Sequence, residues 1–241
     1  MRPTRISAPS DAAGGAPALP PVPDITRLLV AEALGAGLFT LVTVAAGILG
    51  ERFSGGSIGL AMLMTAIAAA AAFAALARAL QAAAPCVFNP ALALIFLLSG
   101  RMALTPALLS AAAQIAGAFL GAMIAHLVTN TGLVQVATQI QTGPGVWTGE
   151  FVATALFVFV ILASGERAPA RIPLTASFCV LAVALATPSM SFANPAVTLA
   201  RTLTDSFTSI RVEDGWPICA FQFLGAVAAH FLARWLLPRK A

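Results

Sequence analysis

Two identical triplets carry the side chains in this sequence that are best suited to bind a solute. Asn89-Pro90-Ala91 comes directly after Phe88, Asn194-Pro195-Ala196 comes two residues after Phe192, and each precedes an apolar run. Proline suits the first turn of a helix, where its missing N–H would be unpaired anyway, so each triplet predicts a helix start. An asparagine in the capping position can accept a hydrogen bond from its own helix, which leaves its NH₂ group free to donate into a cavity.

One Asn-Pro pair alone would indicate ordinary helix capping, because asparagine is a preferred capping residue in any helix. Two copies in matching places of the chain favour a functional role instead. The unpaired N–H groups and the positive dipole end of each helix would then face a common centre. Such a field repels cations and hydrated protons while it offers hydrogen bonds to neutral solutes.

The elements that position these triplets belong to a membrane protein. Hydrophobic residues make up 59% of the 241 residues, charged residues 9%, and the mean hydropathy is +0.93. A soluble domain carries about 25% charged residues, so this composition excludes one. The net charge of +4 comes from basic residues scattered near helix ends, which does not indicate a nucleic-acid partner.

Apolar runs of about 20 residues predict six membrane spans. They cover residues 25–49, 58–80, 106–128, 147–163, 172–187 and 217–237. The runs that follow the triplets, residues 90–98 and 195–204, are too short to cross a bilayer at about 1.5 Å of rise per residue. Such segments are tolerated in a membrane only where they pack in protein or line a cavity. Residues 1–24 are rich in proline and predict a disordered tail without the apolar core of a signal peptide, so that residues 25–241 form the channel domain.

The order span, span, half-span, span occurs twice, in residues 25–128 and 147–237. Glu32 and Glu150 open the first span of each half, and each is followed seven residues later by a phenylalanine, Phe39 or Phe157. An odd number of spans in each half requires that the halves insert in opposite senses. Inverted repeats with broken helices place a site at the bilayer midplane.

Basic residues predict the orientation of the chain. With a cytoplasmic N-terminus, ten of the 13 basic residues lie on the cytoplasmic side, and Arg52, Arg201 and Arg211 lie outside. This bias follows the positive-inside rule. We therefore expect a multi-pass protein of the inner cell membrane with both termini in the cytoplasm.

The two triplets, together with Glu32, Glu150 and the repeated Gln-x-x-Gly-Ala of Gln114 and Gln222, resemble the major intrinsic protein family, the aquaporins and aquaglyceroporins. The resemblance covers nearly all of residues 25–237. It implies an all-α fold of six transmembrane helices plus two re-entrant half-helices, a homotetramer with one pore per subunit, and passive conduction of water or small uncharged solutes. It also implies that Glu32 and Glu150 are structural acids, which hold the loops before the half-helices through backbone N–H groups.

The sequence departs from this family at its selectivity filter. Three residues after the second asparagine most members have arginine, and this chain has Val197. Ungapped spacing puts the other filter positions at Ala69, Ala182 and Ser191, which together form a wide and rather apolar filter without fixed charge. Arg201 lies one turn beyond Val197, where it either supplies a displaced positive charge to the outer vestibule or makes a headgroup or loop contact such as one with Asp205.

Residues 192–207 resemble a bacterial subgroup of the family that is associated with arsenic resistance. The implied solute is arsenite in its neutral trihydroxy form, and a wide filter without arginine is compatible with it. Cys86, three residues before the first asparagine, either faces the lumen or packs as a small apolar side chain. Three cysteines without CxxC spacing and two histidines indicate no metal site, and no cofactor is expected.

Two other classes of function remain as alternatives. An ion-coupled secondary transporter also uses inverted repeats and broken helices, but its site calls for more acids than the two symmetric glutamates. An intramembrane enzyme lacks support, since the chain contains no HExxH motif and no paired His/Asp constellation. The sequence therefore predicts a passive channel for small neutral solutes, namely glycerol-like polyols, arsenite and water.

Overall fold

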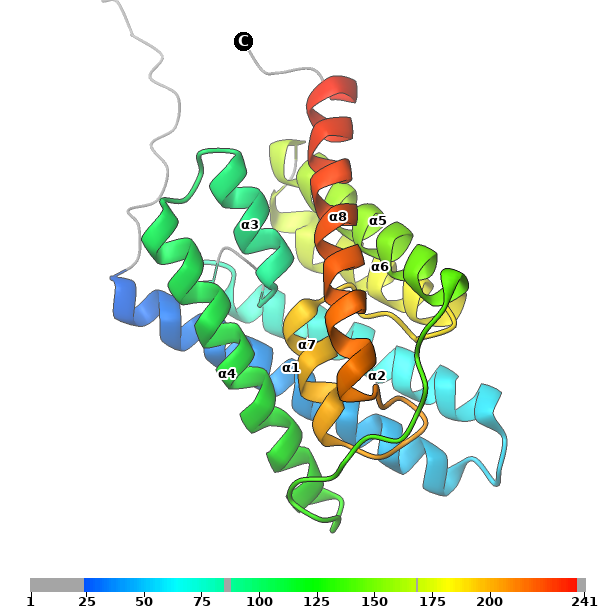
Figure 1. Ribbon diagram of the computed structural model, residues 1–241. Helices are drawn as coiled ribbons and strands as arrows, with labels where there is room; N and C mark the ends of the chain where they lie inside the picture. Colours follow the sequence, from blue (N-terminus) through cyan, green and yellow to red (C-terminus); the bar gives the residue numbers. More distant parts are fainter. Residues whose placement is uncertain (1–23, 85–87, 168, 238–241) are drawn as a thin grey trace, which may run out of the picture.

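The computed structural model describes residues 24–84, 88–167 and 169–237, and its regular secondary structure over these residues is helical (Figure 1). The α-helices are α1 (Ile25–Phe53), α2 (Ile58–Leu80), α3 (Pro90–Leu98), α4 (Leu104–Val128), α5 (Pro144–Arg167), α6 (Ile172–Ala186), α7 (Pro195–Ala200) and α8 (Val212–Leu236). Two short 3₁₀ helices, η1 (Pro169–Arg171) and η2 (Arg201–Leu203), adjoin α6 and α7.

Within the described residues, six helical segments are long and apolar enough to cross a membrane: α1, α2, α4, α5, η1 with α6, and α8. Helices α3 and α7 have nine and six residues and cannot cross it. The prediction of six transmembrane helices and two half-helices in an inverted repeat is confirmed. The last helix begins at Val212 rather than at Pro217, because Glu213 and Asp214 in its first turn suit the positive end of a helix.

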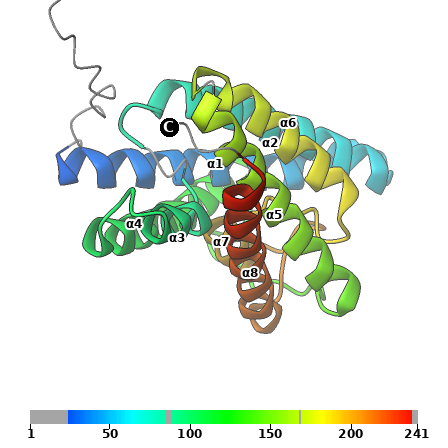
Figure 2. The ribbon, with the colours of Figure 1, turned by 90° about the horizontal axis from the view of Figure 1, so that it is seen from above.

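The two halves are built on the same close helix packing. In the first half α1 lies against α4, and in the second half α5 lies against α8 (Figure 2). A Cβ atom on Gly121 of α4 would lie 2.0 Å from the carbonyl oxygen of Gly37 in α1, and one on Gly225 of α8 would lie 2.2 Å from that of Phe151 in α5. Glycine is therefore required at both contacts, which are of the small-residue kind that holds helices together in membranes.

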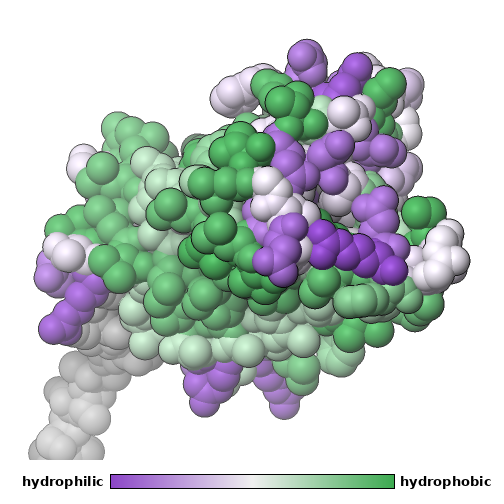
Figure 3. All heavy atoms as spheres, turned by 90° about the horizontal axis from the view of Figure 1, so that it is seen from below, coloured by the Kyte–Doolittle hydropathy of each residue, from purple (hydrophilic) through white to green (hydrophobic). Residues whose placement is uncertain are grey.

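The outside of the bundle is apolar. Large apolar side chains cover much of the face in Figure 3, and examples from the spanning helices are Ile67, Phe178 and Phe231, whose side chains are exposed. Contiguous exposed apolar surface of this extent is unusual in a soluble protein but matches the hydrocarbon of a bilayer. The two half-helices lie inside this shell, where α3 contacts α4, α7 and α8, and α7 contacts α1, α4 and α8.

Replacement of Gly121 by alanine tests the close packing of α1 on α4. We expect Gly121→Ala to lower the free energy of unfolding by about 1–3 kcal/mol, because the new methyl group meets backbone that has no room to move. Gly59→Ala is the matched control, since a Cβ at that helical position meets nothing within 4 Å and removes only glycine's backbone freedom. Thermal unfolding in detergent measures both, and equal melting temperatures for wild type and Gly121→Ala would contradict the packing argument.

Candidate functional site

The two Asn-Pro-Ala triplets start the two half-helices, and each asparagine caps its own helix. The side-chain oxygen of Asn89 accepts from the backbone N–H of Ala91 at 2.9 Å, and that of Asn194 accepts from Ala196 at 3.0 Å. Proline occupies the first turn of both helices, as the sequence predicts. Both asparagines are buried, so their polar groups must find partners within the protein.

The amide groups of the two asparagines connect the half-helices to each other. Nδ2 of Asn89 donates to the carbonyl oxygen of Ala193 at 2.8 Å, and Nδ2 of Asn194 donates to that of Phe88 at 3.0 Å. The expectation that each NH₂ group is wholly free is therefore wrong. One hydrogen of each amide bridges the two motifs, and the other takes no part in this bridge.

Phe88 and Ala193, which supply these carbonyl oxygens, have unusual backbone conformations. Their φ angles are 63° and 51°, in the left-handed region that residues other than glycine rarely adopt. Such a conformation costs about 1–2 kcal/mol for a residue with a Cβ atom. The chain keeps it at the same place in both halves, directly before the asparagine, where it lets each carbonyl meet the asparagine of the other half.

A buried glutamate holds the loop before the first half-helix. Glu32 has no exposed surface, and its carboxylate accepts from the backbone N–H of Phe88 at 2.9 Å and from Nε2 of Gln114 at 2.7 Å. Burial of a carboxylate is costly unless hydrogen bonds satisfy it. Both bonds run to segments more than 50 residues away along the chain, so Glu32 joins α1, α4 and this loop.

Glu150 serves the second half through different donors. Its carboxylate accepts from the hydroxyl groups of Ser189 and Ser191 and from Nε2 of Gln222, the last at 2.7 Å. The expectation of backbone donors thus describes Glu32 but not Glu150. The hydroxyl of Ser191 also accepts from the backbone N–H of Ala193 at 3.0 Å, and in this way the glutamate controls the backbone next to Asn194.

Three of the four predicted filter residues lie inside the bundle and one does not. Ala69, Ser191 and Val197 have no exposed surface. Ala182 is exposed in the groove between α5 and α6, so its assignment to the filter is wrong. Its neighbour Val183 is instead buried in the same apolar cluster as Ala69 and Val197. A shift of one residue rotates a helical position by about 100°, which is enough to turn a side chain from the inside of a bundle to the outside.

Arg201 is buried and does not line an outer vestibule; it makes loop contacts, as the second alternative expected, but not with Asp205. Its side chain is 2% exposed, and its guanidinium donates to the carbonyl oxygens of Ser189, Met190 and Thr208. Its Cζ also lies 5.3 Å from the centre of the Phe192 ring. A guanidinium has five donors in a planar fork, which suits it to collect several carbonyl groups. Arg201 therefore ties the loop before α7 to the loop after η2.

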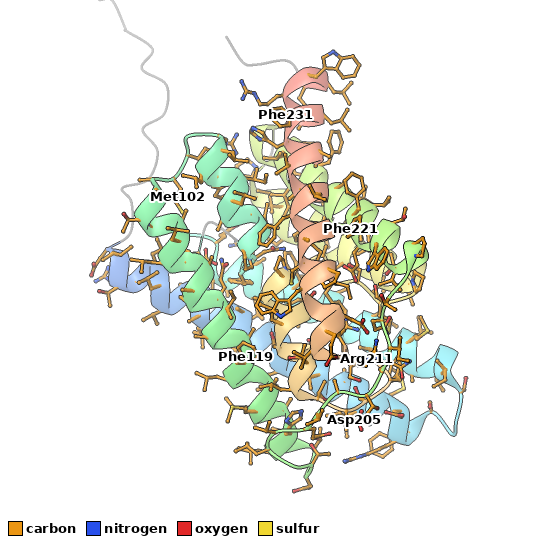
Figure 4. The ribbon with its side chains drawn as sticks, viewed as in Figure 1. Met102, Phe119, Asp205, Arg211, Phe221 and Phe231 are labelled. Atoms are coloured by element: carbon orange, nitrogen blue, oxygen red, sulfur yellow. The ribbon has the colours of Figure 1, made fainter. Side chains whose placement is uncertain are left out.

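Asp205, the expected partner of Arg201, binds another loop. Its Oδ1 accepts from the hydroxyl of Thr138 at 2.8 Å and from the backbone N–H of the same residue at 3.2 Å. Nearby, Arg211 pairs with Asp214 at 3.0 Å, and this hydrogen bond raises the pKa of Arg211 above its ordinary value. Figure 4 shows Asp205 and Arg211 at the same end of the molecule. The charged groups at this end thus hold the connecting segments together.

Two of the cavities lie at opposite ends of α2. One, of about 530 Å³, adjoins the end of α1 and the start of α2, and among its lining residues are Glu51, Met62 and Met190. The other, of about 360 Å³, adjoins the end of α2 and the start of α6, and Ala77, Gln81 and Ile161 are among its lining residues.

No cluster of three or more histidine, cysteine, aspartate or glutamate side chains occurs among the residues that the structure describes. Cys86 lies outside the described residues. The other two cysteines, Cys179 and Cys219, are buried and free. Sequence reasoning missed Ser189, Val183 and Thr198. The hydroxyl of Thr198 accepts a hydrogen bond from Nε2 of Gln222 at 2.9 Å. The pattern Ser-x-Ser before the second triplet is the signal that could have identified Ser189, which donates to Glu150.

Known proteins resemble this chain in sequence and in fold. The sequence model of the major intrinsic protein family matches residues 22–191. The aquaglyceroporin AqpS of Rhizobium meliloti is 37% identical over 214 residues, which cover 89% of this chain and 91% of that protein. The lens fiber major intrinsic protein of Gallus gallus is 32% identical over 224 residues, which cover 86% and 79%. The structure of the aquaglyceroporin from Plasmodium falciparum superposes with a TM-score of 0.69 at 16% identity, over 89% of this chain and 97% of the other.

Removal of the Arg201 guanidinium tests its role as a tie between loops. We expect Arg201→Met to lower the free energy of unfolding by roughly 3 kcal/mol, because it leaves three buried carbonyl groups without their donor. Arg52→Met is the control, since Arg52 is exposed and donates to the single carbonyl of Thr129. Thermal unfolding in detergent reports both. If both variants lose the same free energy of unfolding, the three hydrogen bonds of Arg201 contribute no more to stability than the single bond of Arg52.

Proposed function

The chain belongs to the major intrinsic protein family, and we infer that it is a membrane channel through which small uncharged solutes such as glycerol diffuse passively. It is a transport protein and not an enzyme. The observation that carries this conclusion is the meeting of two half-helices, each started by Asn-Pro-Ala and bridged to the other by its asparagine. The proposals below concern the path, the solute and the assembly.

We propose that solutes pass between the two cavities along the paired triplets. Each asparagine keeps one amide hydrogen that is not used in the bridge, and these two hydrogens would donate to the oxygen atoms of a solute. The positive dipole ends of α3 and α7 meet at the same place. A cation would have to lose its water shell in front of two positive ends, so a neutral hydroxylated solute is favoured.

The proposed filter consists of Ala69, Val183 and Val197, with the backbone around Ser191. These three side chains are small, apolar and buried in one cluster. Arg201, one helical turn beyond Val197, is engaged elsewhere, because its guanidinium is bound to three carbonyl groups. The filter therefore offers no fixed charge, which supports passage of polyols and of arsenite in its neutral trihydroxy form as well as water.

The structure gives no support to the ion-coupled alternative. Such coupling needs a carboxylate that can release its partners to take up an ion. Glu32 and Glu150 are instead both fully buried and bound to donors from other segments of the chain. Their bonds suit a fixed structural role.

We propose a homotetramer with both termini in the cytoplasm. Six spans return the chain to the side on which α1 begins. On that side lie Arg27, Arg78, Arg101, Arg171 and Arg234, and at the opposite ends of their helices lie Arg52 and Arg211, so the positive-inside rule supports this orientation. The exposed groove between α5 and α6 is apolar and contains Gly145, Gly149 and Ala182, which would allow close approach of a neighbouring subunit.

Val197→Arg tests the filter. We expect this variant to lower glycerol permeability by about tenfold, the factor that corresponds to a barrier increase of about 1.4 kcal/mol, because a long charged side chain then occupies the apolar filter. Stopped-flow swelling of proteoliposomes measures the permeability. Val136→Arg, in the exposed loop before α5, is the matched control and should behave as wild type. Unchanged glycerol flux through Val197→Arg would contradict the filter assignment, and wild-type flux no greater than that of protein-free liposomes would contradict the channel itself.

A further inference from the structure

Four phenylalanine rings form an unbroken row through the middle of the bundle. The ring of Phe192 lies 6.1 Å from that of Phe39, Phe39 lies 5.8 Å from Phe73, and Phe73 lies 5.6 Å from Phe157, measured between ring centres. All three pairs meet edge to face, with interplanar angles of 80–83°. The rings come from α1, α2, α5 and the loop before α7, so both halves of the chain contribute.

Each end of the row lies close in the chain to residues that line one of the two cavities. Met190 lines the larger cavity and precedes Phe192 by two residues. At the other end, Ala77 and Ile161 line the smaller cavity, and each lies one helical turn beyond a ring of the row, Phe73 or Phe157. The path proposed between the two cavities therefore runs past these rings.

The rings close this path in the structure. Their exposed fractions are 1% for Phe39, 2% for Phe73, 1% for Phe157 and 3% for Phe192. Side chains that lined an open passage would be in contact with water along one face, and these are not. The filter residues are too small to close the path alone, since Ala69 and Val197 carry one and three side-chain carbons.

One end of the row is fixed and the rest is held by weaker contacts. The guanidinium of Arg201 lies over the face of Phe192, and the same guanidinium is bound to three carbonyl groups. Phe39, Phe73 and Phe157 make edge-to-face contacts, which favour this arrangement without locking the rings in it. Movement of Phe73, which touches a ring on either side, would separate the row into two parts.

We propose that this phenylalanine row, rather than the filter at Val197 alone, sets the size and polarity of the solutes that the channel admits, with Phe73 as the specificity-determining residue. The inference rests on the proposed channel function. Ring faces and edges offer no hydrogen bonds that replace the water shell of an ion, so ions pay the full cost of dehydration there. Neutral molecules with few hydroxyl groups have a lower cost of dehydration. Their width then decides whether the rings can rotate far enough to let them pass.

Phe73→Ala tests this proposal in the full-length protein. We expect the ratio of erythritol to glycerol permeability to rise by about tenfold, because removal of one ring lowers the barrier more for the wider solute, erythritol. Phe73→Leu should raise it less, because leucine keeps most of the buried volume. The matched control is Phe231→Ala, which removes an exposed ring from α8 and should leave the ratio at the wild-type value (Figure 4). Stopped-flow swelling of proteoliposomes in each solute gives both permeabilities.

The outcomes separate the proposal from the channel function on which it rests. If wild type conducts glycerol and both Phe73→Ala and Phe73→Leu keep the wild-type ratio of erythritol to glycerol permeability, the role of the row is overturned and the channel function stands. No glycerol flux through wild type, Phe231→Ala or either Phe73 variant would overturn both. Phe73→Leu, checked by size-exclusion chromatography, decides the question where Phe73→Ala does not yield folded protein.

Discussion

The first N–H groups of a helix have no partner within that helix, and here two helices begin in the interior of a membrane protein, where water is scarce. Asn89 and Asn194 meet this constraint together. Each side-chain oxygen caps its own helix, and each amide binds the carbonyl that precedes the other asparagine. The two half-helices therefore fix each other in position. Loss of one asparagine would remove a cap and also release the backbone of the opposite half.

The buried acids extend the same logic to the loops that lead into the half-helices. Glu32 and Glu150 are fully buried, and each binds a loop together with a glutamine of the helix packed against its own, Gln114 or Gln222. A partner removed from such a group leaves a buried charge unsatisfied, which costs more than an ordinary hydrogen bond contributes. This explains why acids remain in apolar helices without facing a solute. The chemistry left to the solute then comes from the amide hydrogens and helix dipoles.

Arg201 shows how a charge can serve structure in a channel without charging the path. Val197 occupies the position of the arginine that is common in the family, and the guanidinium four residues later is buried against three carbonyl groups and the ring of Phe192. The positive charge of Arg201 thus holds two loops together. Apart from the asparagine amides, the side chains assigned to the proposed path are apolar, namely the filter residues and the phenylalanine row.

Composition and local pattern by themselves determined most of the fold. Apolar runs of about 20 residues identified the six spans, and proline after asparagine identified both half-helix starts, because membrane thickness and helix capping are local constraints. Contacts between distant segments required the tertiary structure. The partner of each asparagine amide lies more than 100 residues away. A rotation of about 100° per residue decided that Val183 rather than Ala182 faces inward. The burial of Arg201 depended on carbonyl groups of two loops, whose positions no spacing in the sequence specifies.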